Sequence, residues 1–132
     1  MKESKPFSIK SRVQSFVPAF NGVLLLFKSE HNAWVHLLLM VASIITGILL
    51  QINSTDWLFL TLAITMVFMS ELINTAIEKL ADKVEPNFNP TIGAIKDYAS
   101  AAVLMASIFA IVVGSIVFGT KIFDFIYGLG TL

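Results

Sequence analysis

Residues 57 to 82 combine a membrane-grade apolar run with an acidic helical stripe. The run reads Trp57-Leu-Phe-Leu-Thr-Leu-Ala-Ile-Thr-Met-Val-Phe-Met69 and, after one serine, continues as Glu71-Leu-Ile-Asn-Thr-Ala-Ile-Glu78-Lys-Leu-Ala-Asp82. A carboxylate next to hydrocarbon costs about 2.5 to 3.5 kcal/mol or more unless it is paired, hydrated or metal-bound. The stretch therefore predicts a cation site at the end of a membrane helix, and we interpret it as a site for phosphate chemistry. At about 100° per residue, four polar side chains fall within roughly an 80° sector of one helix face: Glu71, Asn74, Glu78 and Asp82.

The composition is that of an integral membrane protein. Of the 132 residues, 56% are hydrophobic and only 14% are charged, and the mean hydropathy is +0.81; an ordinary soluble domain is far less apolar. We expect a single domain over residues 1–132. The formal net charge of zero does not indicate nucleic-acid binding. The absence of cysteine excludes a disulfide framework, a thiolate nucleophile and a cysteine metal site.

Three segments are long and uncharged enough to cross a bilayer, which takes about 17 to 25 helical residues: 33–52, 57–80 and 98–120. The second span turns acidic at Glu71 while its helical pattern continues, so its last turns must leave the lipid or face protein. The loop that follows, residues 82–93, holds two prolines, two asparagines and a glycine. The helix must therefore stop in this loop.

Residues 7–28 show a different pattern, with apolar side chains repeating at helical spacing and polar residues interrupting the run. This pattern is typical of an amphipathic helix that lies in the membrane interface, and it fits a fourth span less well. We expect the helix to bend near Pro18, because proline disrupts the helical hydrogen-bond ladder. The predicted fold is thus an all-α membrane protein with three transmembrane helices and an N-terminal amphipathic surface helix.

Basic residues gather on one side of the predicted membrane. Outside the spans, Lys121 alone lies on the far side, and the positive-inside rule therefore places the N-terminus and the acidic stripe in the cytoplasm, where ATP is. Residues 1–10 lack the apolar core and cleavage site of a signal peptide, so we expect the first span to direct insertion. The basic residues on the side of the N-terminus are Lys2, Lys5, Lys10, Arg12, Lys28, Lys79, Lys83 and Lys96.

The predicted topology gathers groups suited to magnesium and phosphate. Mg²⁺ prefers oxygen ligands and usually takes one or two carboxylates plus substrate phosphates. Glu71 and Glu78, two turns apart, could hold a cation and leave one carboxylate free as a base. Glu30, between the surface helix and the first span, could complete the set. Lys96 and Asp97 start the third span on the same side of the membrane. The Lys96 ammonium group, which can bind phosphate, is therefore expected near the acids.

Simpler interpretations of these residues stay open. The acidic stripe could be a solvated helix end, Lys96 could only set the topology, and Asp97 could cap the third span. His36 is typical of an interhelical hydrogen-bonding residue more than of a metal ligand. The usual nucleotide-binding motifs are missing from the chain, including the P-loop and the protein-kinase signatures.

The chain resembles a known family, the small prokaryotic membrane lipid kinases that comprise diacylglycerol kinase and undecaprenol kinase. The resemblance covers about residues 11–118 and rests on Glu-x-x-Asn-x-x-x-Glu-x-x-x-Asp at 71–82, on Lys96-Asp97, and on Ser100-Ala-Ala-Val-Leu. Upstream, Phe27-Lys-x-Glu-x-Asn32 and His36 look like the undecaprenol branch. One departure is that the family's early basic residue aligns with Ser11, while Arg12 is one position off.

The resemblance implies a role for each matching residue. Glu71 would be the general base that takes the proton of the lipid hydroxyl, and Ser100 would lie near the lipid headgroup. Glu30 and Glu78 would bind the magnesium ions that bridge the ATP phosphates. Asn74 and Asp82 would order this face. The remaining nucleotide contacts would come from Asn87, Phe88, Asn89, Lys96 and Asp97.

The expected function is ATP- and Mg²⁺-dependent phosphorylation of a membrane lipid alcohol by in-line transfer of the γ-phosphoryl group. The Lys-x-Glu-x-Asn signature and the apolar C-terminus favour undecaprenol; the alternative is a diacylglycerol kinase that produces phosphatidic acid. The family implies a homotrimer with shared active sites in the bacterial inner membrane. The rivals from other classes are a small ion-coupled transporter, which needs polar residues through the full membrane depth, and a non-enzymatic scaffold.

Overall fold

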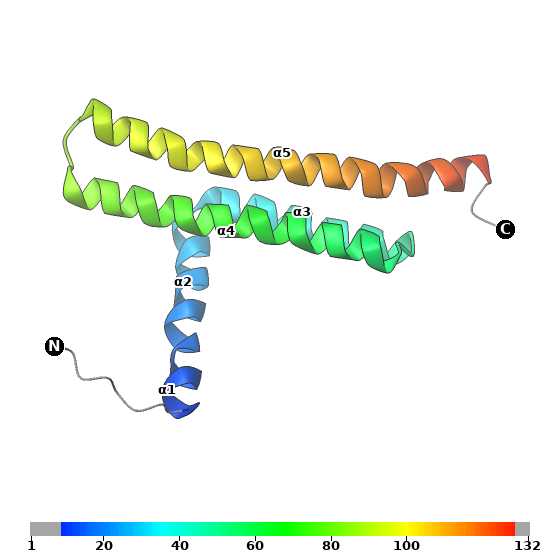
Figure 1. Cartoon of the computed structure of the whole chain (residues 1–132), viewed down its shortest axis with the longest axis horizontal. Helices are drawn as coiled ribbons and strands as arrows, with labels where there is room; N and C mark the ends of the chain where they lie inside the picture. Colours follow the sequence, from blue (N-terminus) through cyan, green and yellow to red (C-terminus); the bar gives the residue numbers. More distant parts are fainter. Residues whose placement is uncertain (1–8, 129–132) are drawn as a thin grey trace.

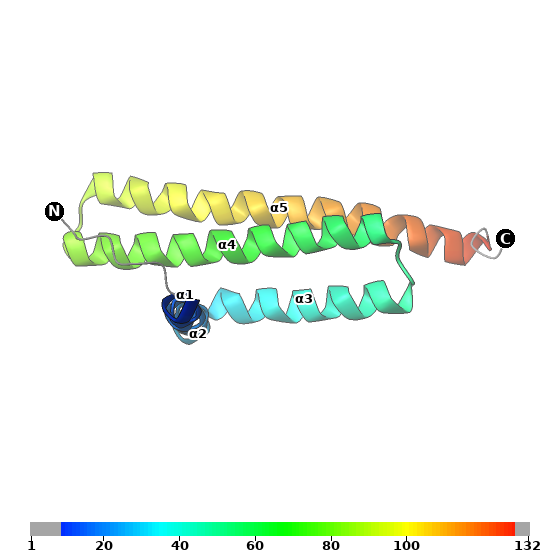
Figure 2. The ribbon, with the colours of Figure 1, turned by 60° about the horizontal axis from the view of Figure 1, so that its bottom comes forward.

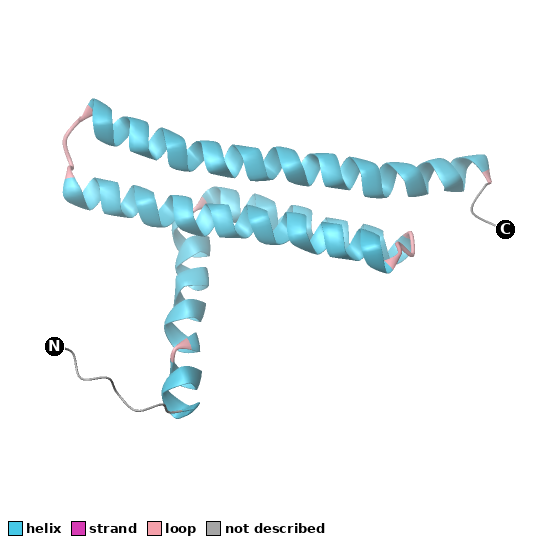
Figure 3. Ribbon diagram, viewed as in Figure 1, coloured by secondary structure: helices cyan, strands magenta, loops and turns pink. Residues whose placement is uncertain are grey.

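The computed structural model describes residues 9–128, and in this part of the chain it consists of helices without strands (Figures 1 and 3). This confirms the all-α fold class. Residues 7 and 8 of the predicted surface helix, and both ends of the predicted domain, lie outside the described residues. The helices are α1 (Ile9–Gln14), α2 (Phe16–Ser29), α3 (His31–Leu49), α4 (Ser54–Val84) and α5 (Pro90–Tyr127).

The helices α3, α4 and α5 run side by side as a bundle, and α1 and α2 extend across its direction (Figures 1 and 2). All three bundle helices are long and apolar enough to cross a membrane. This agrees with the three predicted spans, and the N-terminal helix is also present. The end of the bundle at which α2 joins α3 is called the α2 end below. There the last turns of α4 and the first turns of α5 project beyond the level of α2 (Figure 1).

Two of the helices are longer than the predicted spans. Hydropathy marks only the part of a helix that suits hydrocarbon, whereas α5 has 38 residues and thus a length of about 57 Å. The hydrocarbon core of a bilayer is only about 30 Å thick. Both α4 and α5 therefore continue well past the lipid.

Asparagine caps explain where α4 and α5 begin. The Oδ1 of Asn53 accepts a hydrogen bond from the backbone N–H of Asp56 at 3.0 Å, and the Oδ1 of Asn89 accepts from Thr91 at 2.9 Å. Pro90 follows at the first position of α5, where a missing N–H does no harm. The interpretation of Asp97 as a cap is wrong, because this residue lies two turns inside α5.

The N-terminal helix breaks at Ser15, three residues before Pro18 and thus close to the predicted bend. Proline has no N–H to donate to the carbonyl of Gln14, so the helix cannot run through this point without losing a hydrogen bond. The break three residues earlier puts Pro18 in the first turn of α2, where no donor is needed. Ser15 closes the turn instead, since both its backbone N–H and its hydroxyl donate to the carbonyl of Arg12.

A tight elbow joins α2 to α3 at Glu30. The backbone of this residue is extended, and its N–H donates to the carbonyl of Leu26 at 2.8 Å. The indole Nε1 of Trp34 reaches back to the carbonyl of Phe27 at 2.9 Å, and the two rings meet edge to face. The Phe27 ring also lies 6.2 Å from Phe68 of α4, centroid to centroid. The elbow thus fixes Glu30 against the bundle.

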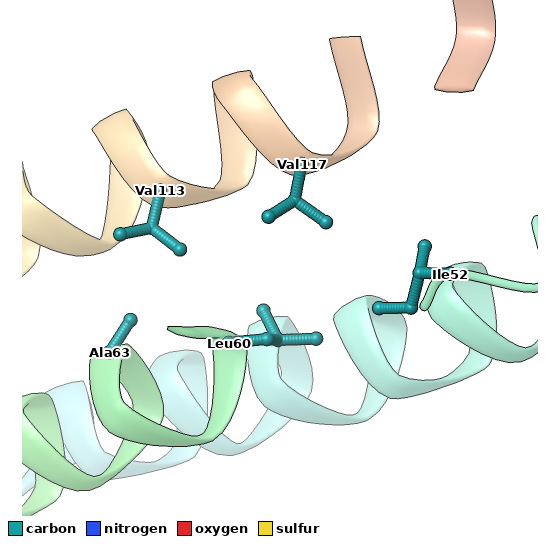
Figure 4. Packing of buried hydrophobic residues seen from close by; sticks show 5 residues of the cluster. All are labelled: Ile52, Leu60, Ala63, Val113 and Val117. Carbon is teal, nitrogen blue, oxygen red and sulfur yellow. The ribbon is translucent and has the colours of Figure 1, made fainter. Parts of the chain in front are cut away.

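The interior of the bundle is apolar at one end and polar at the other. Away from the α2 end, α3–α4 and α5 meet in a small hydrophobic cluster (Figure 4). Buried residues continue along α4 at spacings of three and four, but beyond Val67 they become Glu71 and Asn74. The same helix face therefore supplies both the core and a polar interior. The cluster comprises Ile52, Leu60, Ala63, Val113 and Val117.

The outer faces of the bundle are covered with exposed large apolar side chains, among them Leu38 at 69% and Ile111 at 68%. A surface of this kind would aggregate in water, but it suits contact with lipid tails. Together with the three long apolar helices, it identifies a membrane protein.

Close packing of α3 against the start of α4 gives a stability prediction. A Cβ atom at Gly47 would lie 2.9 Å from the Trp57 ring and 3.0 Å from Ile52. We expect Gly47→Ala to destabilise the fold by about 1 to 3 kcal/mol, as overpacking does. Gly22→Ala is the matched control, because no described residue outside the local backbone of α2 lies within 4 Å of its Cβ position. Thermal unfolding in detergent should show a lower midpoint for the first variant only; equal midpoints would contradict the packing.

Candidate active site

A polar cleft of about 390 Å³ opens at the α2 end between α3, α4 and α5. It gathers five of the residues predicted for the site, namely Glu30, Glu71, Asn74, Glu78 and Ser100. These side chains come from the elbow, from α4 and from α5, so the fold brings together groups that are up to 70 positions apart. The other residues that line the cleft are Asn32, Val35, His36, Val103, Leu104 and Ser107.

Glu71 is the most buried charged residue of the described chain, with 3% of its surface exposed. Its Oε1 lies 2.9 Å from the Nε2 of His36, which reaches it from α3. A carboxylate at this depth needs a donor, because its ionised form loses its hydration on burial. The imidazole supplies that donor, and the predicted role of His36 as an interhelical hydrogen-bonding residue is confirmed.

Asn74 and Glu78 form a second pair one turn further along α4. The Nδ2 of Asn74 donates to the Oε1 of Glu78 at 3.1 Å. The Oδ1 of the same asparagine is buried and has no hydrogen-bond partner among residues 9–128. Leaving a buried acceptor unpaired costs about 1 to 3 kcal/mol. Such an atom in the wall of a polar cleft is suited to a donor or a cation that arrives with a ligand.

Asp82, the last acid of the stripe, does not line the cleft. It forms an ion pair with Lys96 of α5, and its Oδ1 accepts from the Nζ at 2.9 Å. The side chains are 67% and 36% exposed, respectively, so solvent screens the pair and it contributes little to stability. The lysine can therefore exchange this carboxylate for another anion at little cost.

The other residues assigned to the nucleotide lie outside the cleft at the same end. Phe88 is 94% exposed in the α4–α5 loop, and Asp97 is exposed on α5. Asn89 caps α5, while Asn87 bonds to Glu85 through its backbone and its side chain. The predicted site therefore divides into a polar cleft and an exposed outer part. The family's early basic residue aligns with Ser11, next to Arg12. Arg12 lies in α1, and the side chain of Ser11 is outside the described part.

The polar cleft supplies oxygen ligands for a metal ion, but its described residues do not form a complete metal-binding site. Within residues 9–128, no three His, Asp or Glu side chains lie close enough together to hold a metal ion by themselves. Glu30 and Glu78 nevertheless line the same cleft as the unpaired Oδ1 of Asn74. Two carboxylates and an amide oxygen are hard ligands of the kind that Mg²⁺ accepts, with phosphates completing the shell. The donor set fits magnesium that arrives bound to a phosphate.

An apolar groove of about 440 Å³ continues from the cleft toward the opposite end of the bundle. His36 and Ser107 line both spaces, so they mark where the two meet. The sequence did not predict this groove, because residues from three helices form it and they share no linear pattern. The remaining lining residues are mostly aliphatic or small: Leu39, Met40, Ser43, Leu60, Ala63, Ile64, Val67, Phe68, Ala110, Ile111, Gly114, Ser115 and Phe118.

Comparison with known proteins identifies the family. The sequence profile described as prokaryotic diacylglycerol kinase matches residues 18–118. The chain belongs to this family. It is therefore a membrane lipid kinase, a phosphotransferase with an alcohol acceptor, and the resemblance carried by residues 71–82 is confirmed.

Individual relatives of this lipid kinase carry two different names. It is 31% identical over 109 residues to the undecaprenol kinase of Bacillus subtilis, a match that covers 83% of this chain and 89% of the relative. It is 35% identical over 101 residues to a diacylglycerol kinase of Synechocystis, covering 76% and 58% of the two chains. The diacylglycerol kinase of Escherichia coli is 32% identical over 63 residues, about half of each chain. The acceptor lipid thus differs among the relatives.

Proposed function

We propose that this kinase transfers the γ-phosphoryl group of ATP to the hydroxyl of undecaprenol, at the cytoplasmic face of the bacterial inner membrane. One observation carries the proposal: a polar cleft that holds the buried acid Glu71 adjoins an apolar groove, and His36 and Ser107 line both spaces. A lipid alcohol needs both environments, since its hydroxyl must meet polar groups while its tail stays among apolar ones.

Each part of the site has a task in this proposal. Glu71 accepts the proton of the lipid hydroxyl while Ser100 holds the headgroup beside it. Glu30 and Glu78 would hold Mg²⁺, which on binding neutralises negative charge on the phosphates. Lys96 leaves Asp82 to contact phosphate. Asn74 keeps Glu78 in place. The nucleotide lies over the outer part of the site, against Asn87, Phe88, Asn89 and Asp97.

Positioning and electrostatics account for most of the catalysis in this scheme. Glu71 is only 3% exposed, so water competes poorly with the lipid hydroxyl as the group from which this base takes a proton. The apolar groove holds the lipid tail and so places the lipid hydroxyl at a fixed depth in the membrane. Phosphoryl transfer then occurs where the apolar and the polar spaces meet.

The proposed assembly is a homotrimer in which neighbouring chains complete the sites. The cleft is open on one side, and its outer residues are exposed. A second apolar groove, of about 770 Å³, runs along α4 and α5 and includes the small residues Ser70, Ala99, Ala102 and Ala106. Small residues let membrane helices approach closely, so this face suits a helix from another copy. The excess of Lys and Arg at the α2 end supports the cytoplasmic orientation.

The preference for undecaprenol rests on the size of the apolar groove. Residues of α3, α4 and α5 line it, and a volume of about 440 Å³ suits one hydrocarbon chain better than two. Undecaprenol has one isoprenoid chain, whereas diacylglycerol has two acyl chains on adjacent carbons. The name of the Bacillus subtilis relative is consistent with this choice.

Competition between the two lipids tests the proposal. With labelled Mg-ATP and both lipids in one micelle, we expect the purified protein to label undecaprenol at least tenfold faster. Gly114→Leu should raise the KM for the lipid about tenfold without changing the KM for ATP, because the leucine fills part of the groove. Gly119→Leu on the same helix is the control, with open space around it. Faster labelling of diacylglycerol would overturn the choice of lipid.

A further inference from the structure

His36 and Glu71 form a partly buried contact between two membrane helices, and both residues line the cleft next to the groove. The Nε2 and Oε1 atoms are 2.9 Å apart, and the two side chains are 18% and 4% exposed, respectively. Both residues line the polar cleft, and His36 also lines the apolar groove. The contact therefore lies where the headgroup of a lipid alcohol would enter the cleft.

The chemistry of the two groups sets the direction of the hydrogen bond. An ionised carboxylate can only accept, so the Nε2 of His36 must carry the proton and donate it to Oε1. The terminal torsion of a glutamate is soft and leaves the carboxylate plane free to rotate. The bond from His36 removes this freedom and engages one oxygen. The other oxygen, Oε2, is then the atom available to take a proton.

Among the described residues that line the cleft, His36 is the only one with a basic side chain. The lining contains no Lys or Arg, and its other ionisable groups are the carboxylates of Glu30 and Glu78. The amide of Asn74 is engaged with Glu78. His36 is thus the one side chain in the lining that can both donate to Glu71 and carry a positive charge beside it.

The fold does not depend on this contact alone. The elbow holds the start of α3 through the Trp34–Phe27 hydrogen bond, and Phe27 packs near Phe68 of α4. At the other end of α3, Gly47 lies directly against Trp57. Because both ends of α3 are anchored independently, a change at His36 should leave the bundle folded.

We propose that His36 is a positioning residue, which holds the Glu71 carboxylate in the orientation that accepts the proton of the lipid hydroxyl. This inference rests on the proposed function, in which Glu71 is the base. His36 acts through Glu71 and does not itself bind ATP. Its loss should therefore lower kcat and leave the KM for ATP unchanged.

Three substitutions at one position test the proposal. His36→Leu removes the donor and keeps similar bulk. His36→Gln retains an N–H close to the position of Nε2, whereas the shorter His36→Asn places its N–H close to the position of Nδ1. We expect kcat to fall on the order of 100-fold for the leucine and asparagine variants, since a displacement of about 1 Å can have this effect. The glutamine variant should recover kcat to within a few-fold of the wild type.

His31→Leu is the matched control, because it removes an exposed histidine from the same helix. Thermal unfolding and oligomeric size in detergent verify folding, and if the leucine variant fails to fold, the glutamine–asparagine pair still decides. Wild-type kcat in the leucine or asparagine variant would overturn the inference, as would equal loss in all three. Glu71→Gln is assayed in parallel: if it retains turnover, the proposed base is wrong, whereas its inactivity beside an active His36→Leu rejects only the role of His36.

Discussion

Replacing Glu71 by Gln should reduce lipid phosphorylation by about 10²- to 10⁴-fold, the usual contribution of a general base. The amide has nearly the same shape and can still accept the hydrogen bond from His36, so the cleft should keep its geometry. What is lost is the ability to take a proton from the lipid hydroxyl. Transfer of labelled phosphate to extracted lipid, measured at saturating Mg-ATP, gives the rate.

Asp56→Asn is the control for Glu71→Gln. It removes a carboxylate from the same helix, but at the end opposite the cleft. Both variants should unfold at temperatures close to that of the wild type, and only the Glu71 variant should lose activity. If Glu71→Gln retained more than a tenth of the wild-type rate, the buried acid would not be the base.

Replacing Glu78 by Gln should weaken the use of magnesium. The substitution removes one of the two cleft carboxylates that we propose as metal ligands, but it retains an oxygen that can accept from Asn74. Loss of a group that supports a metal site typically costs about 10- to 100-fold in metal affinity or activity. We therefore expect the Mg²⁺ concentration for half-maximal activity to rise at least tenfold, with a lower rate at saturation.

A titration of activity with Mg²⁺ at fixed ATP measures this effect, and Glu30→Gln should shift the curve in the same direction. Asp124→Asn, which removes an acid of α5 at the opposite end, should leave the curve unchanged. An unaltered Mg²⁺ requirement in both glutamine variants would exclude the two carboxylates as metal ligands.

The architecture could be predicted from the sequence because its signals are local. The spans follow from apolar runs, and the acidic face follows from helical spacing between Glu71 and Asp82. The errors arise from local details that hydropathy does not register. The cap of α5 is Asn89, which rules out the alternative interpretation of Asp97 as a cap, and the exact break of the N-terminal helix is at Ser15, three residues before Pro18.

The parts of the site that could not be predicted depend on packing between helices. No spacing rule relates His36 to Glu71, since they are 35 positions apart and on different helices. The pairing of Asp82 with Lys96 likewise depends on how α4 and α5 align. The apolar groove requires three helices at once. Topology places such residues at one membrane depth, but only the folded chain selects the partners.

The hydrophobic cluster around Leu60 and Val113 has a consequence for membrane energetics. The cluster consists of hydrocarbon side chains, two of which, Leu60 and Ala63, also line the apolar groove, and such side chains offer no relay for protons or ions. A cell that stores energy as an electrochemical gradient must keep its bilayer electrically tight. This arrangement lets charged chemistry proceed at one surface of the membrane while the other leaflet remains an insulator.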